Sequence, residues 1–276
     1  MRALKVGQVC PSRMPQLKAA KRLGNIGPHP NAEDTSRPAP LGADRWSYAK
    51  TLANKNNRDR RKPAPSRAAR HIPKSSKGHF VGELVFNRGE HPQRLGFASK
   101  LEHDTALCLI YRPGFADLEE QLAALPFAGA DGKVHNHYFD FRLTQANGRR
   151  ICISVKPERI AETALYTAMF DRVKSAAIGR ICHHAVTVTE RNLHPIELHN
   201  ARLFHAARDA QPEIDFQIEA NLDRILGATP ISEFLKRIGL GGAGFFGVAR
   251  AIRQGHLALF ARDKITANTL IVPGVA

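Results

Sequence analysis

The chain has 276 residues, 43% of them hydrophobic, which is enough for about two domains with apolar cores. Its net charge of +16 is uneven: residues 1–80 hold 18 Lys and Arg against 4 Asp and Glu, and the remainder holds 23 against 21. A basic N-terminal part favours a nucleic-acid backbone as its partner, because counterion release drives such binding. An anionic membrane is disfavoured because no apolar stripe accompanies the charge. A solvated tail without a defined partner is the alternative.

The cysteines are scattered, without a CxxC pair or a secretory leader. This pattern predicts a reducing cytoplasm and excludes a disulfide framework. Structural zinc is equally disfavoured, since Cys182-His183-His184 has no second ligand pair nearby. No window of 18 apolar residues is present, so no membrane span is expected.

Residues 1–77 predict a disordered basic arm. Nine of the seventeen prolines fall within residues 1–76, and large apolar residues are few. Within the arm, residues 44–54 have the pattern of a short helix.

Residues 78–192 predict a mixed α/β domain with strands between helices. The apolar patterns indicate strands, helices and turns in alternation. The expected strands are 78–87, 95–98, 115–118, 138–144, 150–155 and 182–190, and the expected helices begin at Ser99 and span 160–177.

Three residues in this domain suit phosphodiester hydrolysis: Glu102, Asp140 and Lys156. Asn147-Gly148 predicts a type I′ hairpin turn, and Asp140 and Lys156 lie seven and eight residues from it, at the same end of one hairpin. Two carboxylates can hold Mg²⁺, and a lysine adds positive charge beside the reacting phosphate. Glu102 has a second interpretation, because Ser-x-x-Glu from Ser99 is also a helix capping box.

Residues 193–276 predict a small, mainly helical domain. Helices are expected over 196–208 and 214–226, after a Thr229 N-cap with Pro230 at N1, and from Phe245 to a stop at Gly255. Two short strands within 256–273 follow, which completes a winged-helix pattern. Its candidate DNA contacts are Arg250, Arg253, Arg262 and Lys264, although these charges are also typical of a solvated surface.

The motifs SKLE (99–102), EEQ (119–121), YFDF (138–141), ISVKP (153–157) and TVTERNLHPIELHNARLF (187–204) together resemble TnsA, the endonuclease subunit of heteromeric DNA transposons. The resemblance covers residues 78–276 and is tighter in the catalytic half. It implies a restriction-endonuclease-like fold, a mixed sheet flanked by helices, followed by a winged-helix-like domain. Glu102, Asp140 and Lys156 match the family's catalytic Glu, Asp and Lys.

The chain departs from the family pattern at Ser154, which stands where the family has Glu or Gln, and at Tyr138-Phe139-Asp140-Phe141, which stands where the family often has Thr-Pro-Asp-Phe. A serine hydroxyl is a short, weak ligand, so the metal would be held through a water or by the Val155 carbonyl. Gln121 matches a Gln that supports the fold of the family more than its chemistry.

The resemblance implies Mg²⁺-dependent cutting, with Mn²⁺ as a substitute, of the non-transferred 5′ strands at transposon ends. It implies double-stranded DNA, a DDE transposase and an ATPase regulator as partners, and a cytoplasmic, nucleoid-associated location in a bacterium. The alternatives are a stand-alone restriction or repair nuclease of the same fold, and a DNA-binding subunit whose site has decayed at Ser154.

Two further motifs are interpreted as structural. His135-Asn136-His137 spells HNH, but that nuclease motif needs separated elements, so a polar run before the Asp140 strand is expected. The GLGGAG sequence at 239–244 has neither a preceding strand nor a following GK[ST], which favours a flexible turn over a phosphate loop.

Overall fold

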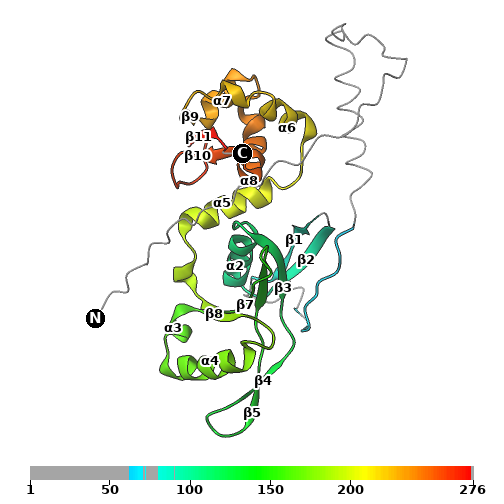
Figure 1. Cartoon of the computed structure of the whole chain (residues 1–276), viewed down its shortest axis with the longest axis vertical. Helices are drawn as coiled ribbons and strands as arrows, with labels where there is room; N and C mark the ends of the chain where they lie inside the picture. The colour runs from blue at the N-terminus through cyan, green and yellow to red at the C-terminus, as the bar shows by residue number, and fades with distance from the viewer. Residues whose placement is uncertain (1–61, 71, 73–79, 90, 275–276) are drawn as a thin grey trace, which may run out of the picture. The chain divides into compact units, whose positions relative to one another are not determined.

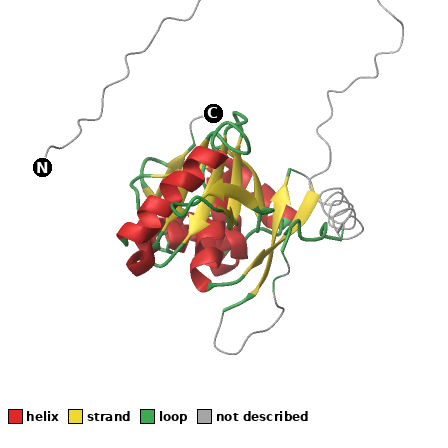
Figure 2. Cartoon of the chain, turned by 90° about the horizontal axis from the view of Figure 1, so that it is seen from below, coloured by secondary structure: helices red, strands yellow, loops and turns green. Residues whose placement is uncertain are grey.

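The computed structural model describes residues 62–70, 72, 80–89 and 91–274, and the short helix expected over 44–54 lies outside these residues. Helices and strands are interspersed along the described chain, which confirms the mixed α/β class (Figure 2). No helix in this part has the length and apolar character needed to cross a bilayer. Cys108, Cys152 and Cys182 are free thiols.

The largest sheet in the described chain has four strands, in the order β3-β6-β7-β8. Its strands are β3 (Phe115–Glu120), β6 (Phe141–Gln145), β7 (Arg150–Val155) and β8 (His184–Val188). β3, β6 and β7 pair antiparallel, whereas β7 and β8 pair parallel. A parallel pair needs a crossover connection, and α3 (Glu158–Ala161) and α4 (Ala164–Ala177) supply it.

Side chains of β7 point alternately into two apolar cores, one on each face of this sheet. Ile153 and Val155 join the core beneath α2 (Lys100–Ile110). This core also contains side chains of the two-stranded sheet formed by β1 (Gly82–Arg88) and β2 (His91–Phe97). Cys152 joins the core beneath α4, together with Phe170 and Val173. Full burial of each such aliphatic or aromatic side chain contributes about 1.5–3 kcal/mol.

The helix expected over 160–177 is two helices, because Thr163 interrupts it. The Thr163 hydroxyl accepts a hydrogen bond from the Tyr166 amide at 3.2 Å and so begins α4. An additional hairpin, β4 (Leu125–Ala128) and β5 (Val134–His137), lies on the α4 side of the sheet, where Leu125 and Phe127 enter the α4 core. A turn that includes Asp131 and Gly132 joins these two strands.

The β6–β7 hairpin forms as expected, but its turn type was predicted wrongly. Gly148 has φ +78°, whereas Asn147 is not among the described residues with positive φ, so a type I′ turn is excluded. The Gly148 amide donates to the Gln145 carbonyl, and the Gln145 amide donates to the Arg149 carbonyl. This is a three-residue loop with a type I turn and a left-handed glycine. The strand β6 begins at Phe141, so Asp140 precedes it.

The C-terminal elements enclose a separate apolar core that includes Ile218, Phe234, Val248, Leu257 and Ile271. The elements in chain order are α5 (Pro195–Ala206), α6 (Pro212–Glu219), β9 (Thr229–Pro230), α7 (Ile231–Arg237), α8 (Phe245–Gln254), β10 (Leu257–Leu259) and β11 (Leu270–Pro273). The three strands pair antiparallel in the order β10-β11-β9.

Two local predictions in this region differ from the structure. Thr229 is buried in β9 opposite Ile271, so it does not cap α7. The helix expected over 214–226 ends at Glu219 and is followed by a 3₁₀ turn at Leu222–Arg224. The GLGGAG turn contains a 3₁₀ segment, Gly241–Gly244. Gly255, with φ +86°, ends α8 as predicted.

Helix α5 connects the sheet region with the C-terminal elements, because it contacts both α2 and α8 (Figure 1). Arg202 on α5 donates two hydrogen bonds of 2.9 Å to the Asp104 carboxylate on α2. On the other side, Asn200 donates to the Asp263 carbonyl and accepts from the Ile265 amide, in the loop between β10 and β11. Both interactions are polar and specific, so they fix the orientation of α5.

Candidate functional site

The β6–β7 hairpin brings Asp140 and Lys156 together. The Asp140 amide donates to the Ile153 carbonyl at 3.0 Å, which places Asp140 beside the end of β7. Its Oδ2 atom then accepts a 2.7 Å hydrogen bond from the Val155 amide and lies 3.7 Å from Lys156 Nζ. Asp140 is 6% exposed, whereas the Lys156 side chain is about one-third exposed, so solvent screens part of the lysine charge that acts on Asp140.

Glu102 is held at the first turn of α2, where Ser99 caps the helix as predicted but the reciprocal bond of a capping box to the Ser99 amide is not formed. The Ser99 hydroxyl accepts from the Glu102 amide at 3.1 Å, as an N-cap does. The Glu102 carboxylate accepts from the Ala98 amide at 2.9 Å and from the Ser99 hydroxyl at 3.1 Å. The return bond therefore goes to the residue before the cap. These contacts orient the carboxylate of a buried side chain.

The Asp140 carboxylate lies close enough to Glu102 to perturb its pKa. Burial raises the pKa of Glu102, and the neighbouring Asp140 charge raises it further. Burial also raises the pKa of Asp140, against the opposing effects of Lys156 and of the Val155 amide. Two buried acids with raised pKa values form a site that gains free energy when a cation is bound.

Gln121 links the two acids, a role that sequence reasoning did not assign to it. It is 2% exposed, and its Nε2 atom lies 3.4 Å from Glu102 Oε2. Its side chain also hydrogen-bonds to Asp140 and lowers the pKa of that carboxyl, while its amide donates to the Asp140 carbonyl at 2.8 Å. Gln121 has φ +43°, which costs about 1–2 kcal/mol for a residue with a side chain.

Arg70, which the sequence placed in the arm, also reaches this site. Its guanidinium donates to Gln121 Oε1, and its charge lowers the pKa of Asp140. The guanidinium carbon lies 5.0 Å from the centre of the Tyr138 ring, at an exposed position. Nothing in the local sequence signals this contact, because Arg70 and Gln121 are 51 positions apart.

Ser154, the position that departs from the family pattern, is fully buried and faces His137. The Ser154 Oγ atom lies 3.4 Å from His137 Nε2. Burial lowers the pKa of His137 to about 4, and the Lys156 charge acts in the same direction, so the imidazole is neutral at physiological pH. The HNH sequence is thus exposed at His135 and Asn136 but turns inward at His137, at the end of β5.

The oxygens around the Lys156 ammonium indicate whether a divalent cation suits this site. Its ammonium lies 3.1 Å from the Val155 carbonyl oxygen and 3.7 Å from Asp140 Oδ2, so two predicted metal-ligand oxygens already face one cation. Carboxylate and carbonyl oxygens are the donors that Mg²⁺ prefers, and Mg²⁺ commonly keeps several waters beside one or two carboxylates. The described chain gathers no three His, Cys, Asp or Glu side chains around one metal position. Asp140, Glu102 and the Val155 carbonyl therefore fit Mg²⁺, whereas the Ser154 hydroxyl points toward His137.

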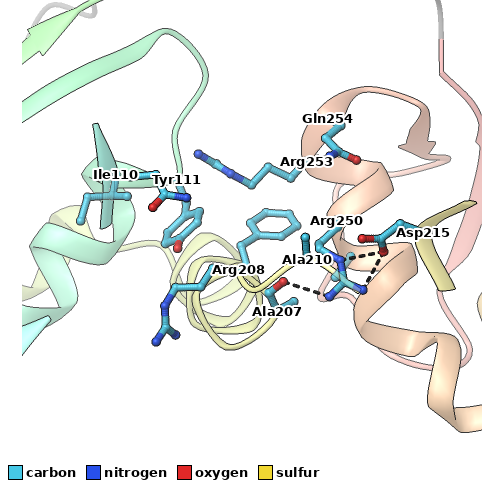
Figure 3. A pocket seen from close by; sticks show the side chains of 12 residues that line it. Ile110, Tyr111, Ala207, Arg208, Ala210, Asp215, Arg250, Arg253 and Gln254 are labelled. Atoms are coloured by element: carbon cyan, nitrogen blue, oxygen red, sulfur yellow. Dashed lines mark hydrogen bonds and ion pairs between the residues drawn. The ribbon is translucent and has the colours of Figure 1, made fainter. Parts of the chain in front are cut away.

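The two predicted DNA contacts on α8 face the protein. Arg250 is 8% exposed and donates to Asp215, to the Ala207 carbonyl and to Gln211, as Figure 3 shows for the first two. The Arg253 guanidinium extends toward α2 and lies 4.4 Å from the centre of the Tyr111 ring (Figure 3). Both side chains line a cavity of about 190 Å³ between α2, α5 and α8. Arg250 thus stabilises the fold and is not positioned to contact DNA.

The other two predicted DNA contacts lie in the loop between β10 and β11. Arg262 is exposed and forms an ion pair with Glu197 on α5. Lys264 is also exposed. The structure thus separates these residues from the Glu102–Asp140–Lys156 cluster by sequence region and by apolar core.

Comparison with known protein families and with characterised proteins finds no match to this chain.

Proposed function

We propose that the protein is a Mg²⁺-dependent DNA endonuclease resembling TnsA. The observation that carries the proposal is the convergence of Glu102, from α2, with Asp140 and Lys156, which flank the open end of the β6–β7 hairpin. The acids share a buried site, and the lysine contacts one of them directly. Perturbed acids beside a fixed cation are typical of hydrolytic centres, although structural ion pairs can perturb pKa values too.

The arrangement of elements is consistent with the fold that the resemblance implies. A mixed sheet with α2 on one face and α4 on the other is the layout expected of a restriction-endonuclease-like core. In the C-terminal part, α6, β9, α7, α8, β10 and β11 follow one another with β11 as the central strand. This order supports a winged-helix-like domain.

The proposed reaction is hydrolysis of a phosphodiester. The oxygen of a water forms a bond to phosphorus, and the bond from phosphorus to one sugar oxygen breaks. A bound Mg²⁺ would polarise the phosphoryl oxygen and favour ionisation of water. Asp140 and Glu102 would hold it, with the Val155 carbonyl. Lys156 stabilises negative charge that develops on the phosphoryl oxygens.

The resemblance supplies the biological setting of this proposal. The enzyme would cut the non-transferred strands at transposon ends, and a DDE transposase would cut and join the other strands. An ATPase regulator is the expected third component, and the bacterial cytoplasm the expected location. A stand-alone nuclease of the same fold would carry the same residues but would cut without a transposase.

A second candidate function follows from Ser154. Because its hydroxyl faces His137 instead of the carboxylates, the site lacks the Glu or Gln oxygen that the family uses. The protein could therefore be a DNA-binding subunit of a transposition complex that does not cleave. Retained DNA binding without cleavage under any metal or partner would favour this function.

The test is nicking of a supercoiled plasmid that carries the element's ends, with Mg²⁺ or Mn²⁺ and with or without the transposase. Lys156→Ala should lower cleavage by about 10²-fold or more, the range found when a charge-stabilising donor is removed. Lys174→Ala is the matched control, because Lys174 is an exposed lysine on α4 that pairs with Asp171. Equal cleavage by both variants would contradict the proposed role of Lys156.

A further inference from the structure

Residues 62–70, termed here the strap, run along the edge of β3. The Arg67 guanidinium makes two hydrogen bonds to the Asp117 carboxylate, at 2.7 and 2.8 Å, and a third to the Leu118 carbonyl. The Glu120 carboxylate accepts from the Ser66 hydroxyl and from the Arg67 amide. A bidentate pair of this kind fixes direction as well as distance, so the strap has a defined register against β3.

The strap is also fixed to β2. The Ala64 amide donates to the Pro92 carbonyl at 2.9 Å, and the Arg94 amide donates to the Ala64 carbonyl at 3.1 Å. The buried side chain of Gln93 donates to the Pro65 carbonyl at 2.6 Å. The strap therefore bridges β2 and β3, although 20 or more residues separate it from either strand in the sequence.

The C-terminal end of the strap holds Gln121. The Ala69 amide donates to the Gln121 carbonyl at 2.9 Å, and the Arg70 guanidinium donates to Gln121 Oε1. A guanidinium has donors only, so the amide oxygen of Gln121 must face Arg70. The amide NH₂ group is thereby directed at Glu102 and Asp140, which can only accept hydrogen bonds when ionised.

Every polar group of Gln121 is used in this arrangement. Its backbone binds Asp140 and Ala69, and its side chain binds Arg70 on one side and the two acids on the other. Left-handed backbone at a residue with a side chain persists where the surroundings over-determine it. Two of these contacts come from the strap, so the strap supports a strained residue that faces both acids.

We propose that the strap is a working part of the hydrolytic site and that Arg70 is a positioning residue, which fixes the Gln121 amide toward Glu102 and Asp140. This inference rests on the proposed endonuclease function. The amide NH₂ group partly offsets the repulsion between the two acids, and its fixed orientation keeps them in place for a metal ion. Stacking on Tyr138 restrains the guanidinium while it does so.

The test is a double-mutant cycle in the full-length protein with Arg70→Ala, Gln121→Ala and the double variant. We expect Arg70→Ala to lower kcat for cleavage about tenfold, because a small misplacement of reacting groups is costly, and to leave KM for DNA within about twofold. The double variant should be no slower than Gln121→Ala, since Arg70 acts through Gln121. Arg70→Lys should recover part of the rate, and Arg172→Ala, which removes an exposed arginine on α4, should have no effect.

Two outcomes of the cycle would overturn the inference. If the fold-decreases in kcat of the two single variants multiply in the double variant, Arg70 acts independently of Gln121. A rise in KM for DNA at unchanged kcat would show that Arg70 contacts the nucleic acid directly. Urea unfolding of each variant separates these results from a general loss of the folded state.

A second measurement keeps this inference distinct from the proposed function. If the wild-type protein cleaves no DNA, the endonuclease proposal fails, and Mn²⁺ binding is then followed by electron paramagnetic resonance. Weaker Mn²⁺ binding in Arg70→Ala, not additive with Gln121→Ala, would still support positioning of the acids by the strap. Unchanged Mn²⁺ affinity in both variants, or additive losses, would overturn it.

Discussion

At the scale of single residues, the site depends on a balance between two acids and one lysine. Burial raises the pKa of both Asp140 and Glu102, and the Asp140 charge raises that of Glu102 further, while Lys156 favours their ionised forms. The lysine is about one-third exposed, so its charge is partly screened by solvent and only partly offsets the burial. The metal-free site is therefore destabilising when both acids are ionised, which is a property expected of a cation site.

This balance predicts how the stability of the metal-free protein depends on pH. A carboxyl with a folded-state pKa above its unfolded value of about 4 stabilises the protein below that value, and this contribution is lost as pH rises through the folded pKa. Asp140→Asn removes one of the two carboxyls, so it should lose less stability than wild type as the pH rises. The melting temperature of Asp140→Asn minus that of wild type should therefore increase from about pH 4 to neutrality. Thermal unfolding in EDTA across this range measures the difference.

Two comparisons check this prediction. Asp131→Asn is the control, because Asp131 is an exposed acid whose pKa is lowered by His135, and it should not gain stability at higher pH. Mg²⁺ should stabilise wild type and not Asp140→Asn, by mass action. A constant difference between wild type and Asp140→Asn at every pH would contradict the prediction.

The sequence located these acids because each has a local signature. The Ser99 capping motif placed Glu102 on a helix, and similar spacings from the Asn147-Gly148 turn placed Asp140 and Lys156 at the same end of one hairpin. Gln121, Arg70 and His137 carry no such signature. Their positions depend on contacts between segments 17 to 51 residues apart, and such pairs cannot be recognised from periodicity in one sequence.

At the scale of elements, the apolar pattern predicted the strand β7 and the helices α2 and α8 well, because these elements are largely buried, β7 on both faces. The wrong predictions of element boundaries arose at polar residues. Thr163 divides a helix by capping its second half, and Thr229 pairs within a sheet where a cap was expected. In both cases a threonine can bond in more than one way, and the tertiary surroundings select between them.

The β6–β7 turn gives a prediction at this scale. Gly148 has φ +78° with open space around its Cβ position, so Gly148→Ala should destabilise the protein by about 1–2 kcal/mol through backbone strain alone. Gly242→Ala is the matched control, because Gly242 also has open space but no positive φ, and it should change stability by less than about 0.5 kcal/mol. Urea unfolding measures both, and equal effects would contradict the assigned turn.

At the scale of the whole molecule, the positive charge and the folded site lie in different parts of the chain. Residues 1–61 hold 13 Lys and Arg against 4 Asp and Glu, whereas the α8 arginines face the protein interior or stack on Tyr111. The face of α8 that packs on α5 cannot contact a DNA groove unless the two helices separate. Affinity for DNA is thus expected to come mainly from the N-terminal residues.

This division predicts the salt dependence of DNA binding. Binding that releases counterions weakens linearly in log salt, with a slope of about −0.9 for each phosphate neutralised. Six substitutions by glutamine, at Arg45, Lys50, Lys55, Arg58, Arg60 and Arg61, should reduce the magnitude of the slope by up to about 5. Fluorescence anisotropy with duplex DNA at 50–200 mM salt measures this slope.

Arg237→Gln is the control, because Glu233 already neutralises Arg237, and it should leave the slope unchanged. An unchanged slope in the sixfold variant would mean that phosphates are bound elsewhere, and Arg262 and Lys264 would become the first residues to test.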